Sequence, residues 1–484
     1  MSPVAPPMVP RIPEIDLISA IMYKFNYYLY KMKQYIEQNK ERFFEELFSL
    51  LRIPSVSAKA EHKPDMYACA ERLSQLLVEA GADSAGLWET DGNPVVFGQK
   101  ISRPDYPTVL VYGHYDVQPA EPLEKWRTDP FEPVLGPDAT GQEAIWGRGA
   151  NDDKGQLFMH IKAFEYLVRT GQLKHNVKFI FEGEEEIGSP SLPAWIKAHK
   201  KMLSADICLV SDTTMISEKV PSINCGMRGL SYLEVKVTGP NKDLHSGHYG
   251  GAVANPIQVL CEMISSLIDS DGRVTVPGFY DKVVELSRAD RRMLARAPFD
   301  LKEYKEFLEI GDVRGEKGYT TLERTGIRPC LDVCGIWGGY TGEGAKTVLP
   351  SEAHAKISMR LVPNQRSAEI TKLFARHFKA IAPKSVKVEV KPCEGGDGFL
   401  IPISSSAYKA ASRAISEVYG VEPVPARGGG SIAVLAEVQK ILGIDPLLMG
   451  FGLERDTIHS PNESYLLKQF FGGMESIALF YKYW

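Results

Sequence analysis

Short apolar runs that end in carboxylates or histidine recur in the first half of the chain. They are bounded by charged residues and glycine, which is typical of buried strands. We expect these strands at residues 108–112, 177–181 and 206–212. Before and between them, apolar residues recur at helical spacing. We expect helices over 14–52, over 64–81 and from about Gly155 to Arg169. Strands that alternate with helices predict βαβ units and a largely parallel sheet.

The pattern changes near Gly226. Residues 233–237 and 386–390 alternate with period two, which predicts an antiparallel sheet with one wet face and helices on the other. Residues 253–269 and 366–382 supply those helices. The earlier pattern then returns, with helices expected over 404–419 and 430–441 and a strand over 445–449.

These two patterns predict two domains, and the length of 484 residues independently favours more than one core. The expected fold class is α/β, with a mixed, mostly parallel sheet flanked by helices and an inserted α+β domain. The α/β domain is expected to cover residues 14–225 and 397–484, and the inserted domain residues 226–396. The proline-rich residues 1–13 are expected to form a disordered tail.

Composition narrows the functional classes. Apolar residues make up 44% of the chain and charged residues 24%, as in a soluble globular protein, and the net charge of −5 argues against a nucleic-acid-binding face. Residues 1–13 lack the order of a signal peptide, and residues 18–30 are too short and too polar to span a bilayer. The seven cysteines form no CxxC pair, and Cys330 and Cys334 lack a second pair that would complete a metal site. We therefore expect a cytoplasmic protein with reduced thiols, without nucleic-acid or membrane partners.

Three polar clusters follow the predicted strands, at residues 113–116, 149–155 and 182–188. Any one of them could be a solvated loop, but polar residues at the C-terminal ends of parallel strands commonly form the sites of open α/β sheets. Three clusters rich in carboxylate, one of them with a histidine, favour a metal site. The candidate ligands are His114, Asp152, Glu186, Asp212 and, far downstream, His459.

The donor set and the neighbouring carboxylates indicate hydrolytic chemistry. Nitrogen and oxygen ligands without thiolate suit zinc, cobalt or manganese, and a bridging carboxylate allows two such ions to sit together. Asp116 lies two residues after His114, on the same side of the strand, and can orient its imidazole. Glu185 lies beside the candidate ligand Glu186 and is expected to take a proton from the bridging water.

Five segments in order resemble the metal-binding motifs of the M20 metallopeptidases, and most closely those of the carnosinase-like, cytosolic non-specific dipeptidase branch. The segments are residues 113–119, 147–155, 182–189, 210–212 and 456–463, and the resemblance covers nearly the whole chain from about residue 40. It implies a zinc-peptidase-like catalytic domain with an inserted ferredoxin-like lid and dimerisation domain. It also implies two divalent ions, Zn²⁺ first and Mn²⁺ or Co²⁺ as alternatives.

The same resemblance assigns roles to the candidate residues. It implies that one ion is held by His114 and Asp212, the other by Glu186 and His459, and both by Asp152. Glu185 is implied as the general base and Asp116 as the carboxylate behind His114. A cis peptide bond between Asp152 and Asp153 is also implied.

The inserted domain carries further segments that resemble the lid of that family. Residues 242–247 resemble the segment whose histidine stabilises the oxyanion, which implies that role for His245. Thr347 and Arg360 are implied as substrate contacts. The loop that holds the substrate's free carboxylate is implied to include Arg427, Gly429, Gly430 and Ser431. Without the family context, the same residues fit a solvated strand face, a surface histidine pair and a plain glycine turn.

Two features depart from the family pattern. Residues 213–215 read Thr-Thr-Met where the branch tends to carry an aromatic residue near the substrate's amino end. Glu184 replaces a more usual neutral residue. Both bear on the preference for the substrate's amino end and leave the hydrolytic chemistry unchanged.

The sequence thus predicts a dinuclear metal hydrolase that cleaves the amide bond of dipeptides or similar small peptides, with Glu185 as general base. The alternative is a hydrolase of N-acyl- or N-carbamoyl-amino acids, which would use the same machinery on another acyl group. An inactive binding protein is a third interpretation, which the complete ligand set disfavours. Because the lids of the branch pair, we also expect a homodimer in which His245 reaches the partner subunit's metals.

Overall fold

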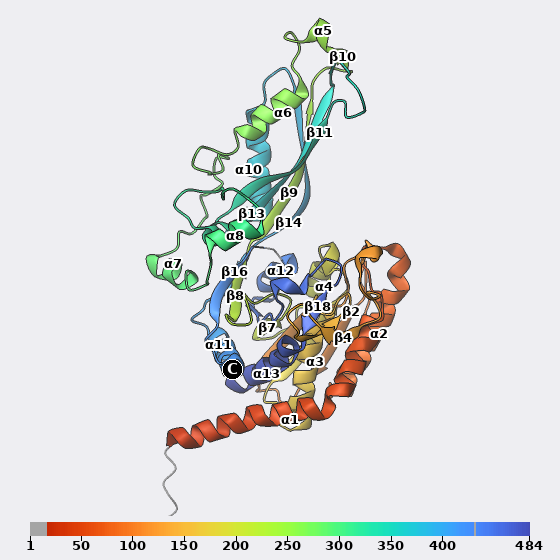
Figure 1. Cartoon of the computed structure of the whole chain (residues 1–484), viewed down its shortest axis with the longest axis vertical. Coiled ribbons are helices and arrows are strands. Elements are labelled where there is room, and N and C mark those ends of the chain that lie inside the picture. The colour runs from red at the N-terminus through yellow and green to blue at the C-terminus, as the bar shows by residue number, and fades with distance from the viewer. Residues whose placement is uncertain (1–16, 430–431) are drawn as a thin grey trace, which may run out of the picture.

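The computed structural model describes residues 17–429 and 432–484, and its lower part is built on one large mixed sheet (Figure 1). Eight strands follow the order β1-β2-β6-β3-β7-β17-β8-β15, and β16 pairs beside β8. In chain order they are β1 (Ser84–Trp88), β2 (Val95–Lys100), β3 (Thr108–His114), β6 (Asn176–Glu182), β7 (Ile207–Val210), β8 (Ser222–Met227), β15 (Phe399–Leu400), β16 (Val424–Gly428) and β17 (Pro446–Leu448). The central strands β6, β3, β7 and β17 are parallel, whereas β2 and β8 join them antiparallel. The expected α/β class with a mixed sheet is confirmed.

The apolar runs form the buried centre of this sheet. In β3 every residue from Val109 to His114 is buried, as expected for a strand that is covered on both faces. Helix α3 (Lys154–Arg169) packs against β3 and is itself buried from Lys154 to Leu167, because α1 and α13 cover it in turn. The other helices of this part are α1 (Leu17–Leu51), α2 (Lys63–Glu79), α4 (Leu192–Ala198), α11 (Ser406–Tyr419), α12 (Ala433–Leu442) and α13 (Leu467–Tyr483).

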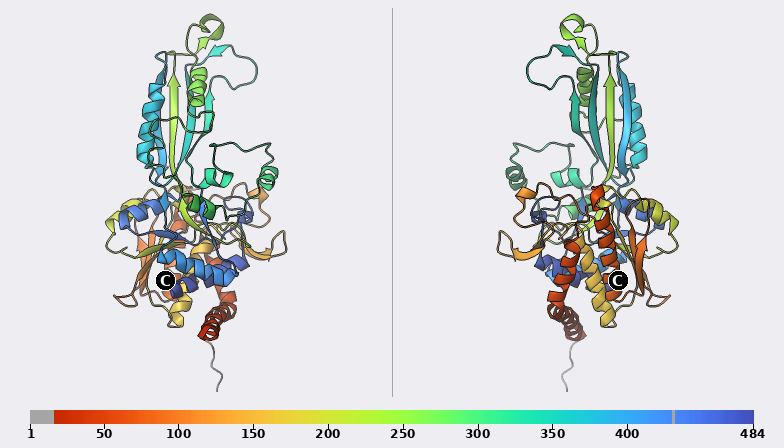
Figure 2. Two further views of the ribbon diagram at one scale, coloured as in Figure 1. Left: turned by 90° about the vertical axis from the view of Figure 1, so that its left-hand side faces the viewer. Right: turned by 90° about the vertical axis from the view of Figure 1, so that its right-hand side faces the viewer.

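Residues 229–396, called here the upper module, form a separate layer above the large sheet (Figures 1 and 2). Four antiparallel strands lie in the order β11-β13-β9-β14. They are β9 (Gly229–Thr238), β11 (Cys330–Gly338), β13 (Glu352–Leu361) and β14 (Lys387–Gly396). Buried and half-buried residues alternate along β9, which confirms the period-two prediction. Helices α6 (Pro256–Ser265) and α10 (Ser367–Ala380) share a second hydrophobic core with this sheet.

The tip and the side of the upper module carry smaller elements. At the tip, β10 (Leu244–His245) pairs with β12 (Val348–Leu349) beside α5 (Ser246–Tyr249). At the side lie α7 (Arg288–Leu294), α8 (Leu301–Phe307) and α9 (Thr321–Gly326). A further three-stranded sheet next to the large one consists of β4 (Val134–Pro137), β5 (Glu143–Trp146) and β18 (Ser464–Leu466). Single 3-10 turns occur at Ala60–His62, Leu123–Lys125, Glu185–Ile187 and Glu454–Asp456.

Among the described residues, the chain crosses between the two parts only at Arg228 and at Asp397–Gly398. The two crossings touch through bare backbone, because a Cβ on Gly229 would lie 2.6 Å from both Gly396 O and Gly398 N. A side chain at position 229 would therefore force the crossing strands apart.

Most predicted helices and strands appear close to the expected positions, although several of their ends differ by a few residues. The helix expected over 253–269 begins only at Pro256, because the Asn255 side chain caps it by accepting a hydrogen bond from Ile257 N. The helix expected from residue 430 is described from Ala433 onward. The expected tail, residues 1–13, lies outside the described residues. In the described part of the chain, no helix combines the length and the apolar character needed to cross a bilayer.

Candidate metal centre

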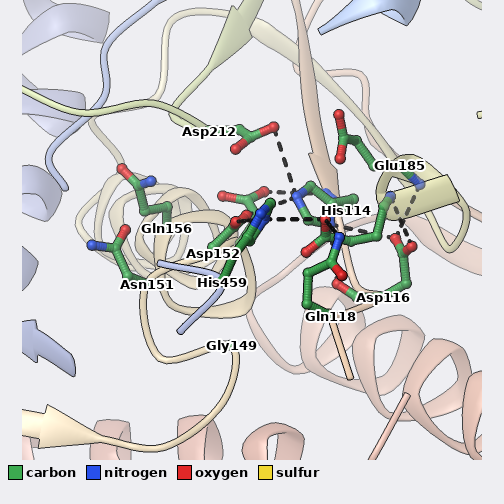
Figure 3. A network of polar contacts seen from close by, with 12 residues as sticks. His114, Asp116, Gln118, Gly149, Asn151, Asp152, Gln156, Glu185, Asp212 and His459 are labelled. Atoms are coloured by element: carbon green, nitrogen blue, oxygen red, sulfur yellow. Dashed lines mark hydrogen bonds and ion pairs between the residues drawn. The ribbon is translucent and has the colours of Figure 1, made fainter. Parts of the chain in front are cut away.

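The first half of the site forms where β3 and β7 end side by side. His114 is the last residue of β3, and Asp212 follows β7, which runs parallel to β3. His114 Nε2 lies 3.7 Å from Asp212 Oδ2 and 3.1 Å from Asp152 Oδ1 (Figure 3). Asp152 comes from the loop before α3. These three side chains offer ligand atoms close enough to hold one metal ion.

The second half shares Asp152. His459 Nε2 lies 2.8 Å from Asp152 Oδ2 and 3.2 Å from Glu186 Oε2. Asp152, Glu186 and His459 form a second group with ligand atoms at metal-binding distances. The two oxygens of Asp152 thus face two different histidines, which is the arrangement that a carboxylate bridging two ions requires. The peptide bond between Asp152 and Asp153 is cis, as the family resemblance predicts.

Asp116 lies buried behind the cluster and connects three of its parts. Its carbonyl oxygen lies 3.1 Å from His114 Nδ1, and its carboxylate Oδ1 lies 3.4 Å from the same nitrogen. Its carboxylate also accepts hydrogen bonds from the backbone amides of Glu185 (3.2 Å) and Glu186 (3.1 Å) and from Ser57 Oγ (2.6 Å). Asp116 therefore orients both the imidazole and the turn that carries the two glutamates.

The charges of the cluster leave room for cations. Among the described residues, the ion pairs of Asp152, Glu186 and Asp212 are made only with histidine, never with lysine or arginine. Burial alone would lower the pKa of His114, but Asp212 and the other carboxylates raise it well above its usual value. Hydrogen bonds to Asp152 and Glu186 raise the pKa of His459 to about 10. The three carboxylates of the two ligand groups outnumber the two histidines, and divalent cations fit this nitrogen and oxygen donor set.

Glu185 lies beside the cluster on the side of Asp212 (Figure 3). Its side-chain carboxylate has no hydrogen-bond partner among residues 17–429 and 432–484, so that both oxygens are available. Burial raises its pKa well above the usual value, and the charges of Asp212 and Glu186 raise it further against the opposing effect of His114. A carboxylate with a raised pKa is suited to accept and release a proton near neutral pH.

The cluster is reached from the side of His459. The His459 side chain is 52% exposed, whereas that of His114 is only 1% exposed. Gln118, which the sequence argument did not single out, donates a hydrogen bond of 2.7 Å to Glu186 Oε2. Its place in the segment 113–119 is the signal that identifies it.

The predicted site residues of the upper module do not join this cluster within a single chain. His245 and Thr347 lie together at the exposed tip, where Ser246 N donates a hydrogen bond to Thr347 O (3.0 Å), far from the large sheet (Figure 1). The His245 ring stacks on His248 with centroids 4.4 Å apart. Arg360 lies at the other end of the module, in register with Leu230 on β9.

The predicted carboxylate loop is described only in part. Arg427 is the second-to-last residue of β16 and lines a cavity between α7, α9 and that strand. Gly429 O accepts a hydrogen bond of 3.1 Å from Arg228 Nε. Gly430 and Ser431 lie outside the described residues.

Both departures from the family pattern have structural explanations. Glu184 accepts hydrogen bonds from the backbone amides of Asn93 and Ser191, each at 3.2 Å, so that it anchors two loops. Thr213 accepts a hydrogen bond of 2.6 Å from Asn224 Nδ2. Thr213 also packs so closely on Gly450 that a Cβ there would lie 2.2 Å from Thr213 Cγ2.

Comparison with known proteins gives consistent matches. The model of peptidase family M20/M25/M40 matches residues 110–483. The Cys-Gly metallodipeptidase of Schizosaccharomyces pombe is 33% identical over 461 residues, which cover 92% of this chain and 96% of the relative. The human Beta-Ala-His dipeptidase is 32% identical over 471 residues, covering 94% and 92%.

Solved structures agree with these sequence matches. The dipeptidase Dug1p from Saccharomyces cerevisiae has a TM-score of 0.78 at 31% identity and covers 94% of this chain and 98% of its own. The M20 family metallo-carboxypeptidase Sso-CP2 from Sulfolobus solfataricus has a TM-score of 0.81 at 31% identity, covering 91% and 98%.

Proposed function

This chain belongs to peptidase family M20/M25/M40 and is a metallopeptidase, and from that premise we propose that it hydrolyses dipeptides with the help of two divalent ions. The observation that carries the proposal is the position of Asp152, whose two carboxylate oxygens face His114 and His459 separately. Two relatives are named for the dipeptides that they cleave, Cys-Gly and Beta-Ala-His, and these names support a dipeptide substrate. They do not favour the alternative of an N-acyl- or N-carbamoyl-amino acid.

We assign His114 and Asp212 to one ion, Glu186 and His459 to the other, and Asp152 to both, with Zn²⁺ as the first choice. When bound, the ions would polarise the substrate carbonyl and lower the pKa of the attacking water. Glu185 accepts the proton of that water and later delivers it to the departing amine. Its unengaged carboxylate and raised pKa support this role. Asp116 keeps His114 and Glu186 in place during the reaction.

We assign the substrate's free carboxylate to the junction between the two parts of the molecule. Arg360 and Arg427 are the cationic candidates there, since a guanidinium pairs with a carboxylate in bidentate fashion. Gly429, Gly430 and Ser431 would add backbone and hydroxyl donors. Thr347 would contact the substrate from the tip of another subunit.

We further propose a homodimer that forms through the upper module. Its sheet has two different edges. The edge strand β14 exposes Lys387, Glu389 and Pro392, which protect an edge against pairing. The opposite edge, β11, exposes Ile336 (51%) and Trp337 (43%). Although β11 also exposes Asp332 and has a register shift between Val333 and Gly335, its apolar residues make it the edge that favours pairing with a second copy. In such a dimer the tip carrying His245 would approach the partner subunit's metal centre.

The His245 assignment has a direct test. We expect His245→Ala to lower kcat about 10²–10³-fold with unchanged metal content, because one oxyanion donor is lost. The matched control is His248→Ala, which removes the stacked neighbour and should leave kcat within a few-fold of wild type. A mixture of the inactive His245→Ala and Glu185→Gln chains should regain activity. In a mixed dimer, up to about half of the sites then have an intact Glu185 and an intact His245 from the partner.

Subunit exchange must be verified with differently tagged chains. Without any recovery in such mixed dimers, His245 would have to act within its own chain or have no catalytic role. A protein that stays monomeric at assay concentration would contradict the dimer proposal as well.

The substrate class is tested with a panel of dipeptides, N-acetyl- and N-carbamoyl-amino acids, each assayed with Zn²⁺ and with Mn²⁺. We expect kcat/KM for the preferred dipeptide to exceed that of every N-acyl compound by at least about tenfold, which corresponds to roughly 1.4 kcal/mol of differential binding in the transition state. The reverse order would overturn the dipeptidase assignment while leaving the hydrolase assignment intact.

We also propose a cytoplasmic location. All seven cysteines are free, including the exposed Cys261, Cys334 and Cys393, which is typical of proteins in a reducing compartment.

A further inference from the structure

Glu463 is a completely buried carboxylate four residues after His459, and it holds the loop that presents Asp152. Its donors are the backbone N–H groups of Gly149, Asn151 and Asp152, each at 3.0 Å, and Arg148 Nη1 at 2.8 Å. Both carboxylate oxygens are thus used twice. In addition, Gly147 N donates a hydrogen bond of 3.1 Å to the Glu463 carbonyl oxygen.

These hydrogen bonds join two segments that are 311 residues apart in sequence at Asp152 and Glu463. All donors belong to residues 147–152, and the acceptor belongs to the loop of His459. On the N-terminal side of His459, Asp456 connects the same two segments by accepting a hydrogen bond of 2.6 Å from Asn151 Nδ2. The loop of His459 is therefore fixed to the loop of Asp152 on both sides of His459 in sequence.

The loop of His459 needs such support. Thr457, His459 and Asn462 have backbone φ values of +52°, +64° and +64°. Residues other than glycine adopt such values only at a cost in conformational energy. Strained residues of this kind persist where surrounding contacts determine them. Glu463 follows this strained stretch directly and anchors its C-terminal end to residues 148–152.

We propose that Glu463 is a positioning residue of the metal centre, which sets the spacing between Asp152 and His459 and so the affinity for the ions. It lies outside the candidate ligand groups and acts through the backbone of the loop that carries Asp152. This inference rests on the proposed role of Asp152 and His459 as ligands. A buried ion pair with Arg148 that merely stabilises the fold would predict a different result in the following experiment.

The experiment measures the affinity of the metal-free protein for Zn²⁺ by competition with a chromophoric chelator. Glu463→Gln removes the charge, and Glu463→Asp keeps the charge but shortens the reach, which provides a variant that folds if the first does not. We expect both variants to bind at least one of the two Zn²⁺ equivalents about 10–100-fold more weakly than wild type, as is typical when groups that orient metal ligands are changed. The rise in Tm on adding Zn²⁺ should shrink accordingly.

Glu165→Gln is the matched control. Glu165 is also completely buried and bonded to cations, Lys162 Nζ at 2.8 Å and Arg42 Nη1 at 3.2 Å, but it joins α3 to α1. The Glu165→Gln substitution should lower the Tm of the metal-free protein and leave its Zn²⁺ affinity within about twofold of wild type. If Glu463→Asp lowers the Tm without weakening Zn²⁺ binding, the positioning role is wrong. If wild type itself binds no Zn²⁺, the proposed function fails instead.

Discussion

Asp152→Ala should lose both metal ions and all measurable dipeptide hydrolysis. The reason is geometric, because Asp152 Oδ1 lies 3.1 Å from His114 Nε2 and Oδ2 lies 2.8 Å from His459 Nε2, so that one side chain serves both ligand groups. Removal of the ions from wild type with a chelator should abolish activity in the same way, and added Zn²⁺ or Mn²⁺ should restore it. Metal content measured by mass spectrometry, together with activity, checks both outcomes.

The matched control for this variant is Asp206→Ala. Asp206 lies at the opposite end of the strand that leads to Asp212 and accepts a hydrogen bond of 2.7 Å from Thr108 N. Its loss should cost about 1 kcal/mol of stability and leave the metal content unchanged. Full activity of wild type after exhaustive chelation, with metal content at zero, would sink the metal-dependent mechanism.

The second large effect separates three consecutive glutamates. Glu185→Gln keeps the shape of the side chain but cannot accept a proton, so kcat should fall about 10²–10⁴-fold with metal retained. Glu186→Gln should instead weaken metal binding, because Glu186 Oε2 lies 3.2 Å from His459 Nε2 in the second ligand group. Glu184→Gln should mainly lower the Tm, because it loses one of the two backbone amides that Glu184 holds.

Steady-state kinetics, metal analysis and thermal denaturation of the three variants distinguish these roles. An exchange of the phenotypes of Glu185 and Glu186 would mean that the assignment within this run is displaced by one residue. Metal loss in Glu185→Gln would show that it is a ligand and not the general base.

The sequence predicts those parts of the molecule whose causes are local. Strand β3 can be predicted because burial on both faces requires a continuous apolar run, which His114 ends. The alternation in β9 is readable because one face of the upper sheet is covered by helices. The candidate ligand residues can be predicted because metal chemistry restricts their types.

Features that depend on distant contacts could not be predicted in this way. β5 pairs with β18, more than 300 residues later, and both strands are short. Glu184 is a carboxylate next to Glu185 and Glu186, so its residue type alone would also fit a catalytic role. It instead accepts hydrogen bonds from the backbone amides of Asn93 and Ser191, which only the folded chain brings to it. The separation of His245 from the ligands is likewise a consequence of the height of the upper module and not of any local pattern (Figure 1).

The position of β17 has a consequence for the order in which the protein is made. β17 lies between β7 and β8 in the centre of the large sheet, although it follows them by more than 200 residues in the chain. The upper module is continuous in sequence and can complete its own sheet as soon as residue 396 has left the ribosome. The large sheet lacks the strand between β7 and β8 until Leu448 has left the ribosome. During synthesis the inserted part is therefore expected to fold before the part that surrounds it.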